Sequence, residues 1–131
     1  MRRSIVLRDD SGSAAAEFVM VGALLTVLTL AALQLGLALL VRNTVVDAAS
    51  EGARIAALAD GSFEDGRQRT IDLITTAVGA SFASDVSVRE GDYLGHPAVV
   101  VTVRAPLPIA GLWGVGETLE ATGHAAVETA H

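Results

Sequence analysis

The feature that most constrains this chain is an uninterrupted apolar run near its N-terminus. Residues 18–41, "FVMVGALLTVLTL" followed by "AALQLGLALLV", contain no charged side chain. A helix needs roughly 20 such residues to cross the hydrocarbon core of a bilayer. The rest of this 131-residue chain is too short to wrap a helix that is apolar on all sides. We therefore expect a transmembrane helix, and the buried core helix of a soluble domain is the alternative.

The charges that flank this run predict its orientation. Arg2, Arg3 and Arg8 precede it, and the positive-inside rule places that end in the cytoplasm. Arg42, directly after the run, is a signal in the opposite direction. We expect residues 42–131 to lie outside the cytoplasmic membrane of a bacterium. The net charge of −6 argues against nucleic acid as a partner, and the absence of cysteine excludes disulfides.

The N-terminal segment is compatible with several kinds of leader. A cleaved signal peptide has a shorter apolar core, and the nearest small-residue cleavage pattern, Ala57-Leu58-Ala59, lies far beyond this one. A twin-arginine signal is suggested by Arg2-Arg3, but Asp9-Asp10 interrupts it. An uncleaved anchor fits the length of the run. It gives no reason for Glu17, the acid at the start of the run.

A fourth interpretation accounts for that acid. If a peptidase cuts after Gly12, the mature chain starts at Ser13, Glu17 becomes its fifth residue and Phe18 its sixth. This arrangement resembles the processing site of type IV pilins and pseudopilins, in which a basic leader ends in glycine and glutamate stands fifth. The resemblance implies a prepilin peptidase as a partner, with Gly12, Ser13, Glu17 and Phe18 as the processing site.

The chemistry of Glu17 agrees with this interpretation. A lone carboxylate at the start of a membrane helix is costly, so it usually marks a function. Cleavage would create a free α-amino group four residues away, and in a bundle of helices Glu17 would pair with that amine of a neighbour. The helix dipole also favours an acid in the first turn. The alternative is that Glu17 is simply solvated among the lipid headgroups.

Beyond the apolar run, the segment 42–61 continues with helical spacing. Its polar residues fall on one face and its small residues on the other. We expect one helix over about residues 14–58, ended by Asp60-Gly61. Small faces let helices approach closely, and Ala32 and Gly36 have the same small-residue spacing. The residues expected to pack in assembly are Glu17, Ala32, Gly36, Ala49, Gly52, Ala53 and Ala56.

Two stretches together resemble a known family. "AEFVMVGALL" and "NTVVDAASEGARIAAL" are similar to the TadE-like minor pseudopilins of tight-adherence (Tad, or Flp) pili, which carry an "A-x-E-G-A-R" segment after one membrane span. Residues 98–114 and 117–129 resemble the strands of that family and the proline-containing stretch between them. The resemblance implies other pilins or pseudopilins, the Tad assembly machinery and membrane lipid as partners. TadF-like or TadG-like relatives would share much of this pattern.

The second half of the chain predicts a small α+β domain. Ser62 and Asp65 form a capping box that opens a second helix. The apolar face expected for it is Phe63, Thr70, Ile71, Ile74, Ala77 and Val78. Three strands with alternating valines, leucine and alanines follow, around residues 86–89, 99–104 and 119–128. We expect a three-stranded antiparallel sheet, with Gly91-Asp92 in the first turn.

Nothing in the sequence predicts catalysis. His96, His124 and His131 lack the spacing of metal ligands. There is no nucleophile elbow and no phosphate-binding glycine loop. We expect a protein that is not an enzyme and holds no metal or cofactor.

One connection is unusually apolar. In "APLPIAGLWGVG", Pro106 and Pro108 stop strand pairing, and Ile109, Leu112 and Trp113 follow. We expect the loop to fold over the sheet edge and bury Trp113. The alternative is an exposed contact surface for a partner subunit or the membrane, formed by the same residues.

These observations predict four segments: a prepilin-type leader (1–12), a transmembrane helix (13–41), an exported continuation of that helix (42–61) and a small α+β domain (62–131). The function that they favour is a minor pseudopilin of a Tad/Flp-type pilus or a related secretion apparatus. An uncleaved single-pass anchor with an external binding domain is the alternative. An exported and released small binding protein is a third, which requires a cut beyond the span.

Overall fold

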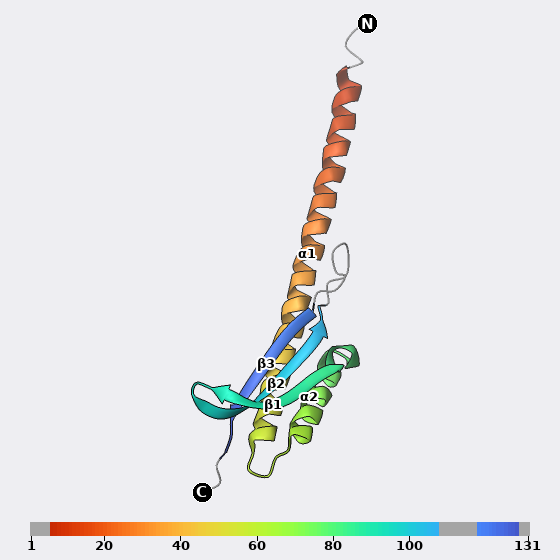
Figure 1. Ribbon diagram of the computed structural model, residues 1–131. Coiled ribbons are helices and arrows are strands. Elements are labelled where there is room, and N and C mark those ends of the chain that lie inside the picture. The colour runs from red at the N-terminus through yellow and green to blue at the C-terminus, as the bar shows by residue number, and fades with distance from the viewer. Residues whose placement is uncertain (1–5, 108–117, 129–131) are drawn as a thin grey trace. The chain divides into compact units, whose positions relative to one another are not determined.

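The computed structural model describes residues 6–107 and 118–128 and has an α+β fold (Figure 1). Its contacts divide the chain into two units, residues 1–36 and 37–131, which are described separately below. The elements in chain order are α1 (Val6–Ala57), α2 (Phe63–Ala77), the 3-10 helix η1 (Ala80–Ala83), β1 (Asp85–Tyr93), β2 (His96–Pro106) and β3 (Thr118–Ala126). The predicted fold, with a long N-terminal helix, a second helix and a three-stranded antiparallel sheet, is confirmed.

The long helix α1 begins earlier than the sequence predicts. It starts at Val6, not near residue 14, so residues of the proposed leader belong to the same helix as the apolar run. Extending an existing helix adds one hydrogen bond per residue, and a single glycine costs only about 1 kcal/mol in water. Gly12 is therefore too weak a break to end the helix. At the other end α1 stops at Ala57, and the amide of Gly61 donates to the carbonyl of Leu58 (2.9 Å) in the turn that follows.

The second helix starts where the capping box predicts. Ser62 is the N-cap of α2, and its hydroxyl oxygen accepts a hydrogen bond from the amide of Asp65 (3.1 Å). The expected apolar face is only partly right. Thr70 and Ile74 are buried together with Gly66, whereas Phe63 is 41% exposed. Ala77 is exposed as well, because α2 buries only a narrow stripe formed by Gly66, Thr70 and Ile74.

The sheet has the order β1-β2-β3, and both pairs are antiparallel. The prediction that Gly91-Asp92 forms the first turn is wrong, since both residues lie inside β1. The turn is Leu94-Gly95, with φ values of 52° and 81°. A two-residue hairpin turn of this kind needs positive φ at both positions, and glycine supplies one of them without strain.

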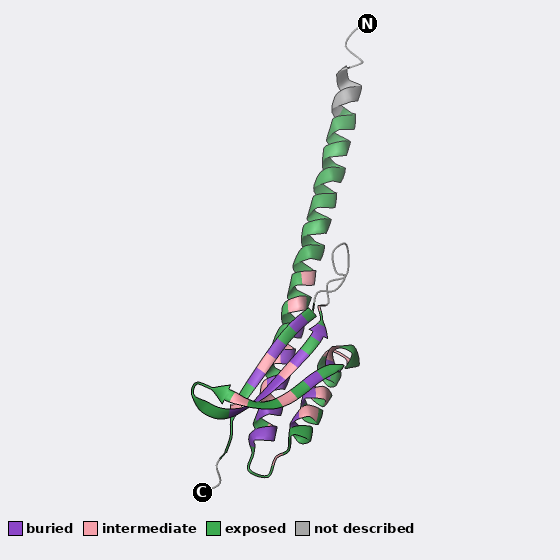
Figure 2. Ribbon diagram, viewed as in Figure 1, coloured by how far each residue is buried: buried purple, intermediate pink, exposed green. Residues whose placement is uncertain are grey.

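The core of the unit 37–131 lies between one face of the sheet and the two helices. Residues 41–53 of α1 contribute to it on one side, and alternate residues of the strands on the other (Figure 2). Val101 and Val103 are fully buried there, as the strand alternation predicts. Val100 is also buried although it points to the opposite face, where its cross-strand neighbours are Arg89 and His124.

Three glycines allow this packing by removing side chains at close contacts. A Cβ on Gly52 of α1 would lie 2.6 Å from the carbonyl oxygen of Gly66 on α2. A Cβ on Gly123 of β3 would overlap the α1 backbone at Ala49 and Ser50. The helices and the sheet therefore meet backbone to backbone, and the small face predicted for α1 packs inside its own chain.

Candidate functional site

The expected processing site lies within α1 and is open to its surroundings. Gly12, Ser13, Glu17 and Phe18 are all helical and exposed, and Phe18 is 79% exposed. No atom lies within 4 Å of the position that a Cβ on Gly12 would occupy. No described residue of the chain covers this segment, and its backbone is helical throughout.

The apolar run that follows has the properties of a membrane span. Within the described residues, the segment Ser11–Ala57 is the one helix long and apolar enough to cross a bilayer, and only 6% of its most apolar window is buried. Figure 2 shows most of this run as exposed, with intermediate residues only toward its C-terminal end. In water such a surface would be strongly unfavourable, and lipid would cover it. The run is thus consistent with a single-pass membrane protein.

The polar side chains inside this run differ in whether they have a hydrogen-bond partner. The hydroxyls of Thr26 and Thr29 donate to the carbonyls of Gly22 and Leu25, both at 2.8 Å, so the helix itself supplies their partners. The side-chain oxygen of Gln34 is buried and has no hydrogen-bond partner in the part of the chain that the structure describes. One glutamine within a leucine-rich run does not stand out in the sequence, so Gln34 was not predicted to have a role.

The residues expected to pack in assembly divide into two groups. Ala32 and Gly36 are exposed, and a Cβ on Gly36 would meet nothing within 4 Å, so this small face is open to another helix. The other group is buried against the chain's own sheet and α2, and it consists of Ala49, Gly52, Ala53 and Ala56. That group has packing partners within the chain, so Glu17, Ala32 and Gly36 are the exposed members of the predicted set.

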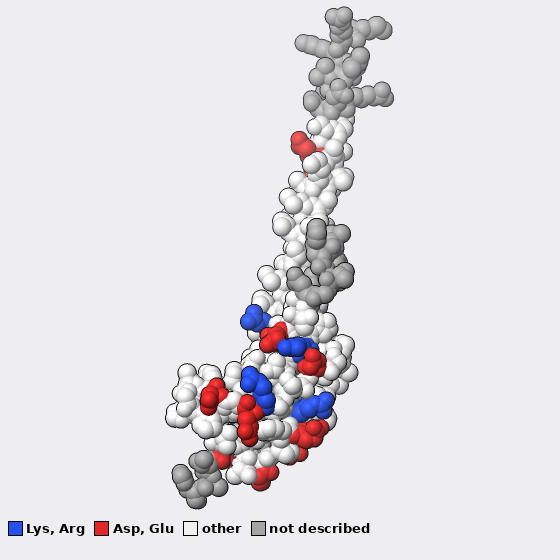
Figure 3. All heavy atoms as spheres, in the orientation of Figure 1, with Lys and Arg blue, Asp and Glu red and all other residues white. Residues whose placement is uncertain are grey.

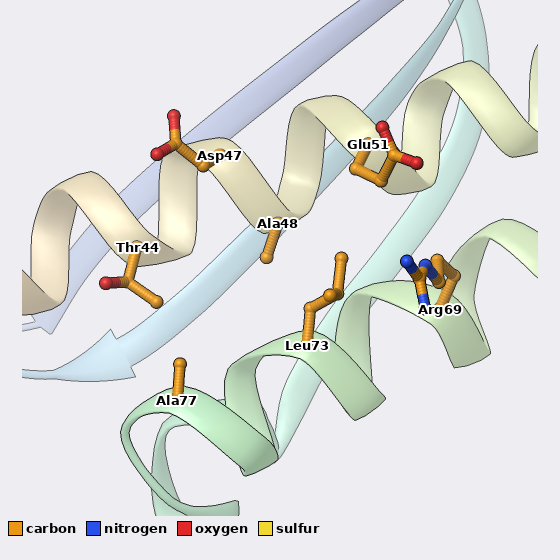
Figure 4. Close-up of a pocket in the computed structure, with 7 residues that line it drawn as sticks. All are labelled: Thr44, Asp47, Ala48, Glu51, Arg69, Leu73 and Ala77. Carbon is orange, nitrogen blue, oxygen red and sulfur yellow. The ribbon is translucent and has the colours of Figure 1, made fainter.

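A groove in the unit 37–131 runs between α1 and α2, with a volume of about 470 Å³ (Figure 4). Ala48 and Leu73 face each other across it, while Asp47 and Glu51 of α1 and Arg69 of α2 stand along its sides. Glu51 pairs with Arg54 at 3.1 Å, a contact of the kind that contributes little at an exposed surface. The groove is open and mixed in charge, and nothing in it resembles a catalytic arrangement.

Among the side chains that the structure describes, the charged ones other than Glu17 belong to the unit 37–131, and Figure 3 shows several of them together. Three ion pairs occur among the described residues, Glu51–Arg54, Glu64–Arg67 and Arg104–Glu120, and all are at least partly exposed. The described residues contain no group of three or more His, Cys, Asp or Glu that could hold a metal ion. His124 stacks on Tyr93 with ring centroids 4.8 Å apart, and this contact crosses the sheet.

The expected partner surface of the apolar loop lies outside the described residues. Ile109, Leu112 and Trp113 belong to the segment 108–117, and His131 also falls outside the described part. The burial of Trp113 therefore stays a prediction. Besides Gln34, sequence reasoning missed Gly66 and Gly123. An isolated glycine in a strand pattern was the available signal for Gly123.

Comparison with known families supplies the remaining observation. Residues 12–54 match the family model described as TadE-like protein. The segment 12–54 of this chain is TadE-like. The match begins at Gly12, contains Glu17 and the whole apolar run, and ends at Arg54, the last residue of the "A-x-E-G-A-R" pattern. It confirms the predicted resemblance over this TadE-like segment, while the resemblance of residues 98–129 stays a prediction. No curated protein and no solved structure matches the chain.

Proposed function

We propose that this protein is a minor pseudopilin of a Tad/Flp-type pilus or a related secretion apparatus. The observation that carries the proposal is the TadE-like segment, which starts at the residue where a prepilin leader would end. The exposed apolar part of α1 supports it, because such a helix needs lipid or other helices around it. In this proposal the protein acts by assembly and not by catalysis.

The proposed sequence of events begins with insertion. The chain enters the cytoplasmic membrane with its N-terminus inside, and a prepilin peptidase cuts after Gly12. Cleavage removes the arginine-rich leader and exposes an α-amino group on Ser13. The helix then packs among other pilin helices of the Tad machinery, and the exported domain contributes contacts at the pilus base or tip.

In the packed helices Glu17 meets the α-amino group of a neighbouring subunit. Glu17 lies four residues after Ser13, or about 6 Å along the helix axis. A carboxylate and an ammonium group brought together in lipid offset the desolvation that each would suffer alone. The exposed position of Glu17 leaves it free for such a neighbour. Pairing at this depth would also fix the axial register between subunits.

The pairing role is tested by Glu17→Ala and Glu17→Gln, with Asp60→Ala as a control that removes an exposed acid from the turn after α1. We expect both Glu17 variants to lower pilus assembly at least about tenfold while the leader is still cleaved, since one buried ion-pair partner is worth several kcal/mol. The control should assemble normally. Normal assembly of both Glu17 variants would remove the proposed role.

One observation favours the alternative of an uncleaved single-pass anchor. Gly12 and Ser13 are helical, and a folded backbone resists proteolysis. In that alternative the groove between α1 and α2 would bind an envelope partner, and Glu17 would remain solvated at the membrane surface. The two functions differ in the N-terminus of the protein found in native membranes.

A further inference from the structure

The polar residue of the apolar run that the helix does not satisfy is Gln34. It lies about two turns before Val41, the last residue of the uncharged run, and is therefore within the expected hydrocarbon region. Its amide carries one acceptor and two donor hydrogens. Lipid offers no partner to these groups, and a neighbouring helix is the usual source of one in a membrane.

The two threonines of the same run differ from Gln34, because their hydroxyls have hydrogen-bond partners within the helix. Thr26 and Thr29 each donate to a carbonyl one turn earlier, so neither needs a second helix. Gln34 has a half-buried side chain whose oxygen has no partner among the described residues. Leu30 and Leu37, about one turn before and after Gln34, are 56% and 45% exposed, so a second helix can approach beside Gln34.

We infer that Gln34 pairs two copies of this chain within the membrane, each Gln34 donating to and accepting from the Gln34 of a second copy. Two copies inserted with the same topology necessarily place this residue at the same depth. An amide is self-complementary, because one group both donates and accepts. A different helix would need its own polar residue at this depth, whereas a second copy always has Gln34 there.

The inferred contact uses a different face from the small-residue pair. Successive helical residues are about 100° apart, so residues two positions away lie nearly opposite. Ala32 and Gly36 therefore point away from Gln34, whereas Leu30 lies one turn before it on the same face. Pairing of two copies through Gln34 leaves the face of Ala32 and Gly36 open for other pilin helices.

The test measures self-association of the full, uncleaved chain in phosphatidylcholine vesicles. The chain has no cysteine, so Thr76→Cys, on the exposed side of α2, provides one site for donor and acceptor dyes. Energy transfer is followed while the protein-to-lipid ratio is varied. Flotation of the vesicles confirms that each variant is inserted, so that a loss of insertion is not mistaken for a loss of pairing.

We expect Gln34→Leu to weaken self-association about five- to thirtyfold, the range measured for hydrogen bonds between model transmembrane helices. Thr29→Val is the matched control, because it removes a hydroxyl that is already satisfied within its helix, and it should associate as the parent does. Gln34→Asn keeps the amide and should retain part of the association. A monomeric parent, or equal association of Gln34→Leu and the parent, would overturn the inference.

Oxidative cross-linking identifies the face. Leu30→Cys should form a disulfide-linked dimer in the vesicles, and Ala32→Cys should not. The reverse result would assign the contact to the small-residue face and would contradict pairing through Gln34. The inference rests on membrane insertion but not on cleavage after Gly12, so failure of leader processing in cells would leave it standing.

Discussion

At Gly123 the packing of this domain leaves no room for a side chain. A side chain there would overlap the backbone of α1, and the carbonyl oxygen of Ala49 would lie 2.6 Å from the new Cβ. The backbone atoms of a helix cannot move away from such a contact, whereas the end of a flexible side chain can. The contact between β3 and α1 therefore requires glycine at this one strand position.

We predict that Gly123→Ala lowers the free energy of unfolding by about 1–3 kcal/mol, the usual cost of overpacking a core. Thermal unfolding of the full chain in detergent micelles, followed by circular dichroism, measures this. Gly36→Ala is the control, because no atom lies within 4 Å of its Cβ, and it should cause no loss. Equal stability of the two variants would mean that β3 does not approach α1 so closely.

Sequence reasoning found some of these residues and missed others for a physical reason. The small face of α1 was visible because its alanines and Gly52 recur with helical spacing. Gly66 and Gly123 belong to elements far away in the sequence, and only the fold brings them against that face. Gln34 was missed because one amide does not change the apolar character of the run around it.

At the scale of elements, α2 depends on its first turn. Ser62 accepts a hydrogen bond from the amide of Asp65 and donates to the carboxylate of the same residue at 2.7 Å. These contacts satisfy one of the amides that a helix N-terminus leaves without a partner. Glu64 and Asp65 in the first turn also complement the helix dipole.

We predict that Ser62→Ala destabilises the chain by about 1 kcal/mol, the typical cost of losing an N-cap. Ser62→Asp keeps an acceptor at the cap and should retain most of the parent stability. The comparison uses the same thermal unfolding in micelles. If the aspartate variant were destabilised as much as the alanine variant, the hydroxyl of Ser62 would be acting through something other than capping.

The sequence predicted the boundaries of helices and strands correctly where interactions between neighbouring residues set them. The N-cap of α2 and the alternating strands were predictable, since capping and strand periodicity are local. The first hairpin turn was predicted wrongly because Gly91-Asp92 is a common turn pair, yet strand pairing continues through it to Tyr93. The start of α1 was also misplaced, because residues 6–12 of the proposed leader do not stop the helix.

In the whole molecule, the two units are suited to different environments. The unit 1–36 presents an exposed apolar helix, whereas the unit 37–131 has its own buried core and a charged surface. Lipid suits the first and water the second. The arginines of the leader predict that the second unit is exported.

We predict that a cysteine introduced by Thr76→Cys reacts with a membrane-impermeant maleimide in intact spheroplasts. The absence of other cysteines makes the labelling specific to this site. Permeabilising the membrane should not increase the yield, because α2 is already outside. Labelling only after permeabilisation would reverse the topology and would be incompatible with assembly into an external pilus.

If the TadE-like segment begins at a prepilin cleavage site, the native protein has a new N-terminus, which can be determined by sequencing. Protein isolated from native membranes would be sequenced from its N-terminus, and its intact mass would be measured. Cleavage after Gly12 gives a chain that begins at Ser13, with Glu17 as its fifth residue. A chain that still begins at Met1 or Arg2, in cells whose prepilin peptidase is active, would contradict it and would favour an uncleaved membrane anchor.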